Sequence, residues 1–375
     1  MVDVDVSFQG PSDPERVKQA LARWLNERWR AATTIQIHDF ATPQSSGYSN
    51  ETVMFRASWR EGGQPRDKRY VLRMEPQRLP VFPLQTSVQR PSVEVQYRAM
   101  KAVADHSTVP LAPLVGYEAS PTWVGAPFFV MGCVEGRVPV DVPLYTLAGF
   151  IVEEATPAQR RRVIESGLDV LAQIHRIDWT RADVDWLVPQ GRSPGLRWQL
   201  DLHRDYVHAQ LRGRAHPILE PALAWLEAHF PGEGGLGFSS GDARIGNMIF
   251  ADFECAAVTD WEAVALGPAE MDLGWWLMFD RYAHESAGAT RLDGMPTREE
   301  QKAYYESRAG RRLGDTRYFE ILAATRFTAV MIPNGDRFTA DGRVPAEMNL
   351  AIHNPGTQVL ADLLEIPYRW TDPPR

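Results

Sequence analysis

The sequence predicts an α+β protein of two lobes, with an antiparallel sheet in a small amino-terminal lobe and a larger, mainly helical carboxy-terminal lobe. Strand-like segments gather in the first third of the chain, and helix-like segments fill most of the rest. A length of 375 residues is too great for one small domain and suits two lobes. A hydrophobic content of 44% is sufficient to form a packed core.

The amino-terminal lobe is predicted to begin with a helix and to continue as a sheet. Residues 14–30 place apolar side chains at helical spacing. Residues 34–40, 51–59 and 69–74 have the composition of strands. A second helix is predicted over residues 92–104, because helical spacing continues there until a proline-containing stretch interrupts it.

The boundary between the lobes is placed near residue 134. Residues 128–131 form an apolar run that leads into a glycine-containing segment, which is typical of a strand followed by a connection. We therefore assign residues 1–134 to the amino-terminal lobe and residues 135–375 to the carboxy-terminal lobe.

The carboxy-terminal lobe begins with a strong helix signal at Thr156, where threonine, Pro157 and Gln159 form a capping box. That helix should run to His175, which we interpret as a structural histidine. Further helices are predicted at 198–212, 271–282, after a second capping box at 297–300, at 318–332 and at 357–365. Residues 333–345 contain two prolines and two turn-forming glycine pairs, so we expect a mobile connection there.

The most informative segment spans residues 240–260. Asp242 is followed by Asn247 and, thirteen residues later, by Asp260. The apolar runs 247–250 and 255–259 are separated by four residues that can turn, which predicts a β-hairpin. The start of the first strand of a hairpin lies beside the end of the second. Asn247 and Asp260 should therefore meet at the open end, with Asp242 on the loop that enters it.

These three residue types are those that phosphoryl transfer needs. A carboxylate can accept a proton from a hydroxyl group, and an asparagine with an aspartate offers hard oxygen ligands to Mg²⁺. A single aspartate or asparagine near a strand end is more often a turn former or a helix cap. Their convergence on one hairpin favours the functional interpretation.

The segment SGDARIGN at 240–247, the hairpin ending in DWE at 260–262 and the segment GPAEMDL at 267–273 resemble a known family. They are similar to the aminoglycoside phosphotransferase and choline kinase-like group, whose members are small-molecule kinases with a protein-kinase-like fold. The resemblance therefore implies a two-lobed, protein-kinase-like fold, with nucleotide bound by the small lobe and catalysis and substrate binding in the large lobe.

The resemblance also implies roles for individual residues. Asp242 would be the catalytic base, and Asn247 and Asp260 would hold Mg²⁺. Asp272 would be the buried aspartate that braces the catalytic loop through main-chain hydrogen bonds. Ser240 stands where the family often has a histidine, which is usually structural. Arg244, within the same loop, is expected to neutralise charge on the transferred group.

The nucleotide, ATP or alternatively GTP, is expected to contact a Ser/Gly/Asn turn at residues 45–50. Its flanks are predicted strands, so the turn is placed like the loop that covers nucleotide phosphates in kinases. Main-chain N–H groups are the useful feature of such a loop, and glycine permits a close approach. The expected contacts are Ser46, Gly47, Ser49 and Asn50.

By the same resemblance, Arg73 occupies the place where many related kinases have a lysine that contacts phosphates, and this exchange is not neutral because the guanidinium is a planar fork. The position at which the family has the acidic partner of that cation is occupied by Gln96 in this chain. Glu94 is two residues away, which turns it to the opposite side of a helix. The ion pair is therefore either absent or rebuilt. Met131 and Cys133 lie in the segment that would meet the adenine edge.

Composition excludes several other classes. A net charge of −8 gives no support for nucleic-acid binding, and no apolar stretch is long enough to span a bilayer. The first residues have no signal-peptide pattern. Cys133 and Cys255 lack metal-ligand spacing, so we expect reduced thiols in a cytoplasmic protein.

The sequence therefore predicts an ATP- and Mg²⁺-dependent kinase that acts on a hydroxyl group of a small molecule. A non-catalytic, pseudokinase-like nucleotide-binding module is the main alternative. A protein kinase is less favoured, because Trp261 and Glu262 replace the Phe-Gly pair after the metal aspartate. Nothing in the sequence selects an antibiotic over a metabolite as the acceptor, and the oligomeric state stays open.

Overall fold

The computed structural model describes residues 13–29, 33–41, 51–76, 81–86, 88 and 90–369. A five-stranded antiparallel sheet in the order β1-β2-β3-β5-β4 forms the centre of the amino-terminal part. Its strands are β1 (Gln36–Ala41), β2 (Glu51–Glu61), β3 (Gln64–Met74), β4 (Leu114–Glu118) and β5 (Phe128–Gly132). The predicted antiparallel sheet is confirmed, and β4 is a strand that the sequence analysis missed.

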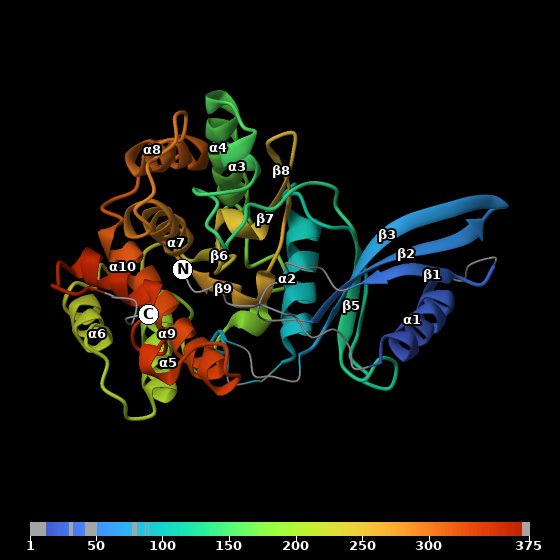
Figure 1. Cartoon of the computed structure of the whole chain (residues 1–375), viewed down its shortest axis with the longest axis horizontal. Helices are drawn as coiled ribbons and strands as arrows, with labels where there is room; N and C mark the ends of the chain where they lie inside the picture. The colour runs from blue at the N-terminus through green and yellow to red at the C-terminus, as the bar shows by residue number, and fades with distance from the viewer. Residues whose placement is uncertain are drawn as a thin grey trace.

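One helix covers each face of this sheet, and β5 shows why. Side chains alternate between the two faces of a strand. Phe128 and Val130 pack with α1 (Pro14–Trp29), whereas Phe129 and Met131 pack with α2 (Ser92–His106). The sheet and α1 form one end of the molecule, and α2 stands between the sheet and the helical part (Figure 1).

The carboxy-terminal part is mainly helical, as predicted. Its helices are α3 (Phe150–Glu153), α4 (Pro157–Ile174), α5 (Leu196–Leu211), α6 (Leu219–Ala228), α7 (Glu270–Arg281), α8 (Arg298–Ala309), α9 (Arg317–Ala340) and α10 (Pro355–Leu364). Two small antiparallel pairs join them, β6 (Gly237–Ser239) with β9 (Ala265–Gly267) and β7 (Met248–Ala251) with β8 (Glu254–Val258). Short helical turns occur at η1 (Asp185–Leu187), η2 (Ile245–Asn247), η3 (Trp261–Ala263), η4 (Tyr282–Ser286) and η5 (Ala346–Met348).

Both predicted capping boxes are present. The Thr156 side chain accepts from the Gln159 N–H while the glutamine side chain returns a bond to the cap, and α4 starts there. Thr297 and Glu300 do the same at the start of α8. Each box satisfies N–H groups that a helix start leaves without partners, so local sequence determines these two helix starts.

The hairpin that carries the candidate site is confirmed, but its connection is shorter than predicted. The four-residue connection was wrong: only Asp252 and Phe253 link β7 to β8, and both have positive φ angles, 49° and 65°. Two residues of positive φ form the tight turn that matches the twist of a hairpin. The open end is as expected, since the Thr259 N–H donates to the Asn247 carbonyl at 2.9 Å.

The predicted connection over 333–345 was also wrong in its first part, because α9 continues through Pro333 to Ala340. A proline inside a helix costs about 3 kcal/mol, so tertiary contacts must offset it. Gly335 lies so close to the following segment that a Cβ there would be 2.4 Å from the Ala351 nitrogen. The Arg214 guanidinium also donates twice to the Asp336 carboxylate, at 2.6 and 2.8 Å.

The proposed lobe boundary near residue 134 falls directly after β5 and stays a prediction. None of the helices in the described part of the chain combines the length and the apolar character that crossing a membrane requires.

Candidate active site

The open end of the β7-β8 hairpin brings Asn247 beside the loop that contains Asp242. The Asn247 side-chain nitrogen donates to the Asp242 main-chain carbonyl at 3.0 Å. The main-chain carbonyl of Asn247 accepts from both the N–H and the hydroxyl of Thr259, at 2.9 and 3.1 Å. Because the Asn247 nitrogen is engaged by the loop, its side-chain oxygen is the atom available to a ligand.

Asp260 follows Thr259 and adopts a left-handed backbone, with φ 56° and ψ 64°. Non-glycine residues rarely take this conformation, and aspartate tolerates it better than most. Burial raises the pKa of its carboxyl group, but the neighbouring charges of Arg73 and Arg244 outweigh burial and hold the pKa below its usual value. The carboxylate is therefore ionised and suited to a cation.

In the described structure, the cation that contacts Asp260 is the guanidinium of Arg73, on β3. Its Nη1 lies 2.6 Å from Asp260 Oδ1, and its side chain is almost completely buried. The acidic partner of Arg73, which the sequence left open, is therefore Asp260. Glu94 pairs with Arg90 at 2.7 Å and with Arg98 at 3.6 Å. Arg73 therefore pairs with the aspartate that follows the hairpin and not with an acid on α2.

Gln96 stands at the position where the family resemblance placed an acid, and it is buried. Its Nε2 donates to the Ser92 hydroxyl at 3.2 Å, and that hydroxyl donates to the Glu262 carboxylate at 3.2 Å. A neutral amide on α2 is therefore connected through Ser92 to a carboxylate next to the hairpin. These bonds hold the start of α2 against the segment that follows Asp260.

Asp242 lies deep in the site, with 12% of its side chain exposed. Trp275 Nε1 on α7 donates to its Oδ1 at 2.7 Å, and Arg244 Nε is 3.4 Å from the same oxygen. Burial raises the pKa of this carboxyl group, while Arg244, Asn247 and Trp275 oppose the increase. Arg244 also donates to Asp141 at 2.6 Å, so a network of charged and polar groups surrounds the carboxylate.

Asp272 braces the loop before Asp242, as expected. Its buried carboxylate accepts from the Ser239 hydroxyl at 2.7 Å, the Ser240 N–H at 2.8 Å and the Gly241 N–H at 3.0 Å. His175 is the structural residue that was predicted, since its Nε2 lies 3.0 Å from Asp272. Two consecutive main-chain donors therefore point at one carboxylate.

Arg326 is a component of the site that sequence reasoning missed. This buried residue of α9 donates from Nη2 to the Gly241 carbonyl at 2.8 Å and from Nε to His203 Nε2 at 3.1 Å. His203 donates its other ring N–H to the Gln199 carbonyl at 2.7 Å. Burial and then the charge of Arg326 lower the pKa of His203 to about 3, so the ring is neutral. An arginine inside an otherwise apolar helical pattern was the available signal.

The predicted nucleotide contacts lie in two places. Ser46, Gly47, Ser49 and Asn50 are outside the described residues. Met131 is the second-last residue of β5 and is buried against α2, whereas Cys133 follows the strand. The Cys133 N–H donates to the Arg69 carbonyl at 3.0 Å. That donor is therefore occupied within the sheet, and any base would have to use other main-chain groups of this segment.

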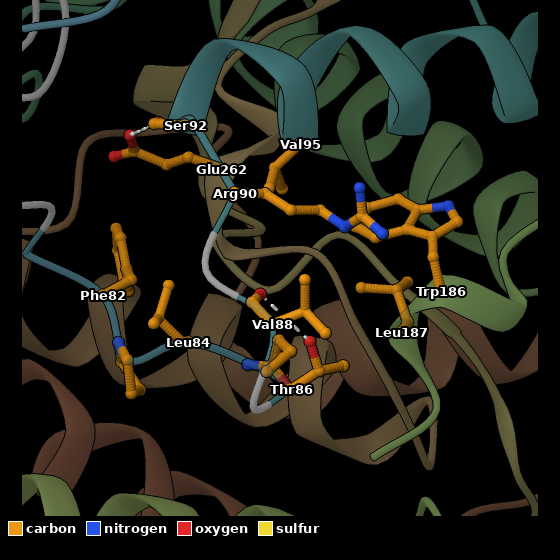
Figure 2. A pocket seen from close by; sticks show the side chains of 12 residues that line it. Phe82, Leu84, Thr86, Val88, Arg90, Ser92, Val95, Trp186, Leu187 and Glu262 are labelled. Atoms are coloured by element: carbon orange, nitrogen blue, oxygen red, sulfur yellow. Dashed lines mark hydrogen bonds between the residues drawn. The ribbon is translucent and has the colours of Figure 1, made fainter. Parts of the chain in front are cut away.

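A small pocket opens beside the Asp260 segment, where residues 82–86, 88, 90 and 92 face residues 186–187 (Figure 2). Glu262 points toward Ser92 at one end, and most of the remaining lining is apolar, with Phe82, Leu84, Val88, Val95, Trp186 and Leu187. A volume of about 50 Å³ holds a few water molecules, whereas small-molecule sites have several hundred. This pocket therefore cannot hold a ligand of that size.

Comparison with known proteins agrees with this geometry. The family model described as "Phosphotransferase enzyme family" matches residues 41–313. A curated relative, "Probable acyl-CoA dehydrogenase IBR3" of Arabidopsis thaliana, is 26% identical over 261 residues, which cover 64% of this chain. The match covers 30% of that relative, so the chain corresponds to about a third of its length.

Solved structures show the same fold. A putative aminoglycoside phosphotransferase from Ralstonia eutropha matches with a TM-score of 0.67 and 21% identity, over 92% of this chain and 98% of the other. A thermostable mutant of aminoglycoside phosphotransferase APH(4)-Ia, in a ternary complex with ADP and hygromycin B, matches with a TM-score of 0.53 and 15% identity, over the same shares of the two chains. The expected kinase-like fold is thereby confirmed.

Proposed function

The chain belongs to the phosphotransferase enzyme family, and from this premise we propose that it transfers the γ-phosphoryl group of ATP to a hydroxyl group of a small molecule. The observation that carries the proposal is the convergence of Asp242, Asn247 and Asp260 at one hairpin end, with Arg73 reaching Asp260 from the sheet. Phosphoryl transfer depends mainly on positioning and charge stabilisation, and this arrangement supplies both.

Asp242 orients the acceptor hydroxyl and accepts its proton. The raised pKa of its buried carboxyl group brings this base closer to neutral pH. Arg244, whose Nε is 3.4 Å from that carboxylate, stabilises negative charge on the transferred group. Arg73 contributes a second guanidinium on the nucleotide side.

Asn247 and Asp260 are the residues that would hold Mg²⁺. The donor set fits this ion, because it consists of an ionised carboxylate and an amide oxygen, and Mg²⁺ takes few protein ligands together with phosphate and water. If bound there, Mg²⁺ would neutralise charge on the nucleotide phosphates. Arg73, on the same side of the site, would contribute its guanidinium to the phosphates.

The nucleotide would lie between the lobes, with residues 1–134 as the nucleotide-binding lobe and 135–375 as the catalytic and substrate-binding lobe. The APH(4)-Ia structure with ADP supports nucleotide binding by this fold. The turn at residues 45–50 would cover the phosphates, and the main chain around Met131 and Cys133 would contact the base. GTP stays an alternative donor, although guanine would need a different set of main-chain donors and acceptors from adenine.

The acceptor is proposed to be a small-molecule alcohol, and a structural relative binds the small molecule hygromycin B together with ADP. Acids available for a polycationic aminoglycoside are few along α7 and η4, because arginines already engage them. Asp280 pairs with Arg291 at 2.5 Å, and Glu285 pairs with Arg298 at 2.5 Å. The structure therefore gives no preference for a polycation.

A cytoplasmic location fits the two cysteines. Cys133 and Cys255 are both free of disulfide bonds, and reduced thiols persist in reducing compartments. We therefore include a cytoplasmic location in the proposal.

The test is calorimetric titration with ATP and GTP, each with and without Mg²⁺, followed by measurement of phosphate release and transfer to a panel of alcohols. Asp242→Asn should bind the nucleotide like the wild type and lose at least about 100-fold in turnover, because a general base contributes about 10²- to 10⁴-fold. Unchanged turnover in this variant would remove Asp242 from its role as base.

A pseudokinase-like module that binds nucleotide without catalysis is the second candidate. It is favoured by the Arg73–Asp260 ion pair, which occupies a metal-binding carboxylate, and by the neutral Gln96 on α2. It predicts saturable nucleotide binding with no turnover on water or on any alcohol. The same titration and assay separate the two candidates.

A further inference from the structure

The catalytic aspartate is held by a tryptophan from a helix that is distant in sequence. Trp275 is almost completely buried on α7, and its indole N–H is 2.7 Å from Oδ1 of Asp242. A hydrogen bond to an ionised carboxylate is stronger than one between neutral groups. The contact therefore fixes the position of the carboxylate and engages Oδ1, not Oδ2.

The indole itself is held in place from the other side. The Arg326 guanidinium lies over the Trp275 ring, 4.6 Å from its centroid, and Phe279 packs against the same ring at 5.3 Å. Arg326 also donates to the carbonyl of Gly241, the residue before Asp242. One buried cation thus fixes the indole relative to the catalytic loop.

Gly241 shows how tightly the loop is confined at this point. Its N–H donates to Asp272 at 3.0 Å while its carbonyl accepts from Arg326 at 2.8 Å. Its φ is +78°, and a Cβ there would lie 1.8 Å from the Ala263 carbonyl oxygen. The main chain before Asp242 is therefore clamped from α7 and from α9, and the side chain is clamped by Trp275.

We propose that Trp275 is a positioning residue for phosphoryl transfer, which engages Oδ1 of Asp242 and reserves Oδ2 for the proton of the acceptor hydroxyl, with Arg326 holding the indole. This inference rests on the proposed function. The acceptor oxygen forms its bond to the γ-phosphorus, its proton passes to Oδ2, and the bond between that phosphorus and the bridging oxygen of ADP breaks. ADP leaves with that electron pair.

The experiment compares Trp275→Phe with the adjacent Trp276→Phe. Phenylalanine retains an aromatic ring against Arg326 and Phe279 but removes the N–H. Trp276 is equally buried, and its N–H donates to Gln301 at 2.7 Å instead of to the catalytic loop. The control therefore loses the same kind of bond without touching Asp242.

The measured quantities are kcat for ATP hydrolysis with water as the acceptor and the dissociation constant for ATP with Mg²⁺. We expect Trp275→Phe to lower kcat about 10- to 100-fold, as small displacements of a catalytic group do, while ATP affinity stays within about twofold. Trp276→Phe should leave both kcat and ATP affinity within about twofold of the wild type.

A spectroscopic measurement tests the contact without turnover. The indole ¹H–¹⁵N signal that disappears in Trp275→Phe should move in Asp242→Asn at constant pH, because the N–H then loses its carboxylate acceptor, whereas the indole signal that disappears in Trp276→Phe should keep its position. A Trp275 signal that is the same in the wild type and in Asp242→Asn, or wild-type kcat in Trp275→Phe, overturns the inference while the proposed function stands. A wild-type protein that binds ATP without turnover overturns both.

Discussion

Replacing Asp272 with asparagine removes one oxygen from the carboxylate that supports the catalytic loop. That carboxylate has no solvent exposure. Its Oδ1 accepts from the Ser239 hydroxyl and the Gly241 N–H, and its Oδ2 accepts from the Ser240 N–H and lies 3.0 Å from His175 Nε2. An amide has one oxygen, so its NH₂ group must face one of these two sets of donors.

The free-energy cost comes from the hydrogen-bond donors that the amide leaves without an acceptor. Whichever way the amide turns, one main-chain N–H, of Ser240 or of Gly241, loses its acceptor and faces a donor. A hydrogen bond to a charged group contributes about 1.5–3 kcal/mol, and a buried unpaired donor costs about 1–3 kcal/mol. The Ser239 hydroxyl can rotate to a new acceptor, so we expect Asp272→Asn to lower the free energy of unfolding by about 3 kcal/mol.

Equilibrium unfolding in urea at pH 7, followed by tryptophan fluorescence, measures this difference. The matched control is Asp252→Asn in the β7-β8 turn, where the side chain is exposed and asparagine tolerates the φ of 49°. The control should change the free energy of unfolding by less than about 0.5 kcal/mol. Turnover of Asp272→Asn should fall as well, because the loop that carries Asp242 loses a main-chain anchor.

The stability of the protein should depend on pH through this carboxylate. Burial raises the pKa of Asp272, but the bonds from His175, Ser239 and the Ser240 N–H outweigh burial and lower it. Because the folded pKa is below the unfolded value of about 3.9, the stabilisation is present above that pH and is lost as the pH falls through the folded pKa. The difference between wild type and Asp272→Asn should therefore shrink in acid. An equal urea midpoint and slope for the two proteins at pH 7 would refute the reasoning.

Two other changes test the metal position and the confinement of the loop. Asp260→Ala should abolish the Mg²⁺-dependent part of ATP binding with little change in circular dichroism, and equal ATP affinity by calorimetry in the presence of Mg²⁺ would disprove the metal assignment. Gly241→Ala should destabilise the protein by more than about 3 kcal/mol, because its Cβ would collide with the Ala263 carbonyl. Gly213 has a similar φ of +81° with open space around it, so Gly213→Ala should cost only the backbone strain of about 1–2 kcal/mol. Similar urea midpoints for the two glycine variants would contradict the collision.

Local sequence was sufficient for features that depend on neighbouring residues. The capping boxes at Thr156 and Thr297 start their helices because side chains three residues apart satisfy each other. The β7-β8 hairpin and the approach of Asn247 to the Asp242 loop follow from two apolar runs and a turn. The turn itself was mispredicted, because two residues of positive φ, one of them Phe253, are not a common turn sequence.

Long-range packing decided what local patterns could not. Pro333 and Gly335 are typical of a connection, yet α9 continues through both because its far half packs against the segment before α10. β4 is short, and its pairing with β5 rather than its composition makes it a strand. The partner of Arg73 depended on whether the hairpin or α2 approaches β3 more closely, and no local spacing contains that distance.

The sequence by itself therefore determined the two-part α+β architecture, the hairpin and the three polar residues that converge on it, because periodicity, capping and turn chemistry act over a few residues. Only the tertiary structure decided that Arg73 pairs with Asp260, that Trp275 holds Oδ1 of Asp242, and that Arg326 clamps Gly241. Those contacts join residues that are 33 to 187 positions apart. Their geometry depends on how whole helices pack against the sheet and the hairpin, which no short stretch of sequence encodes.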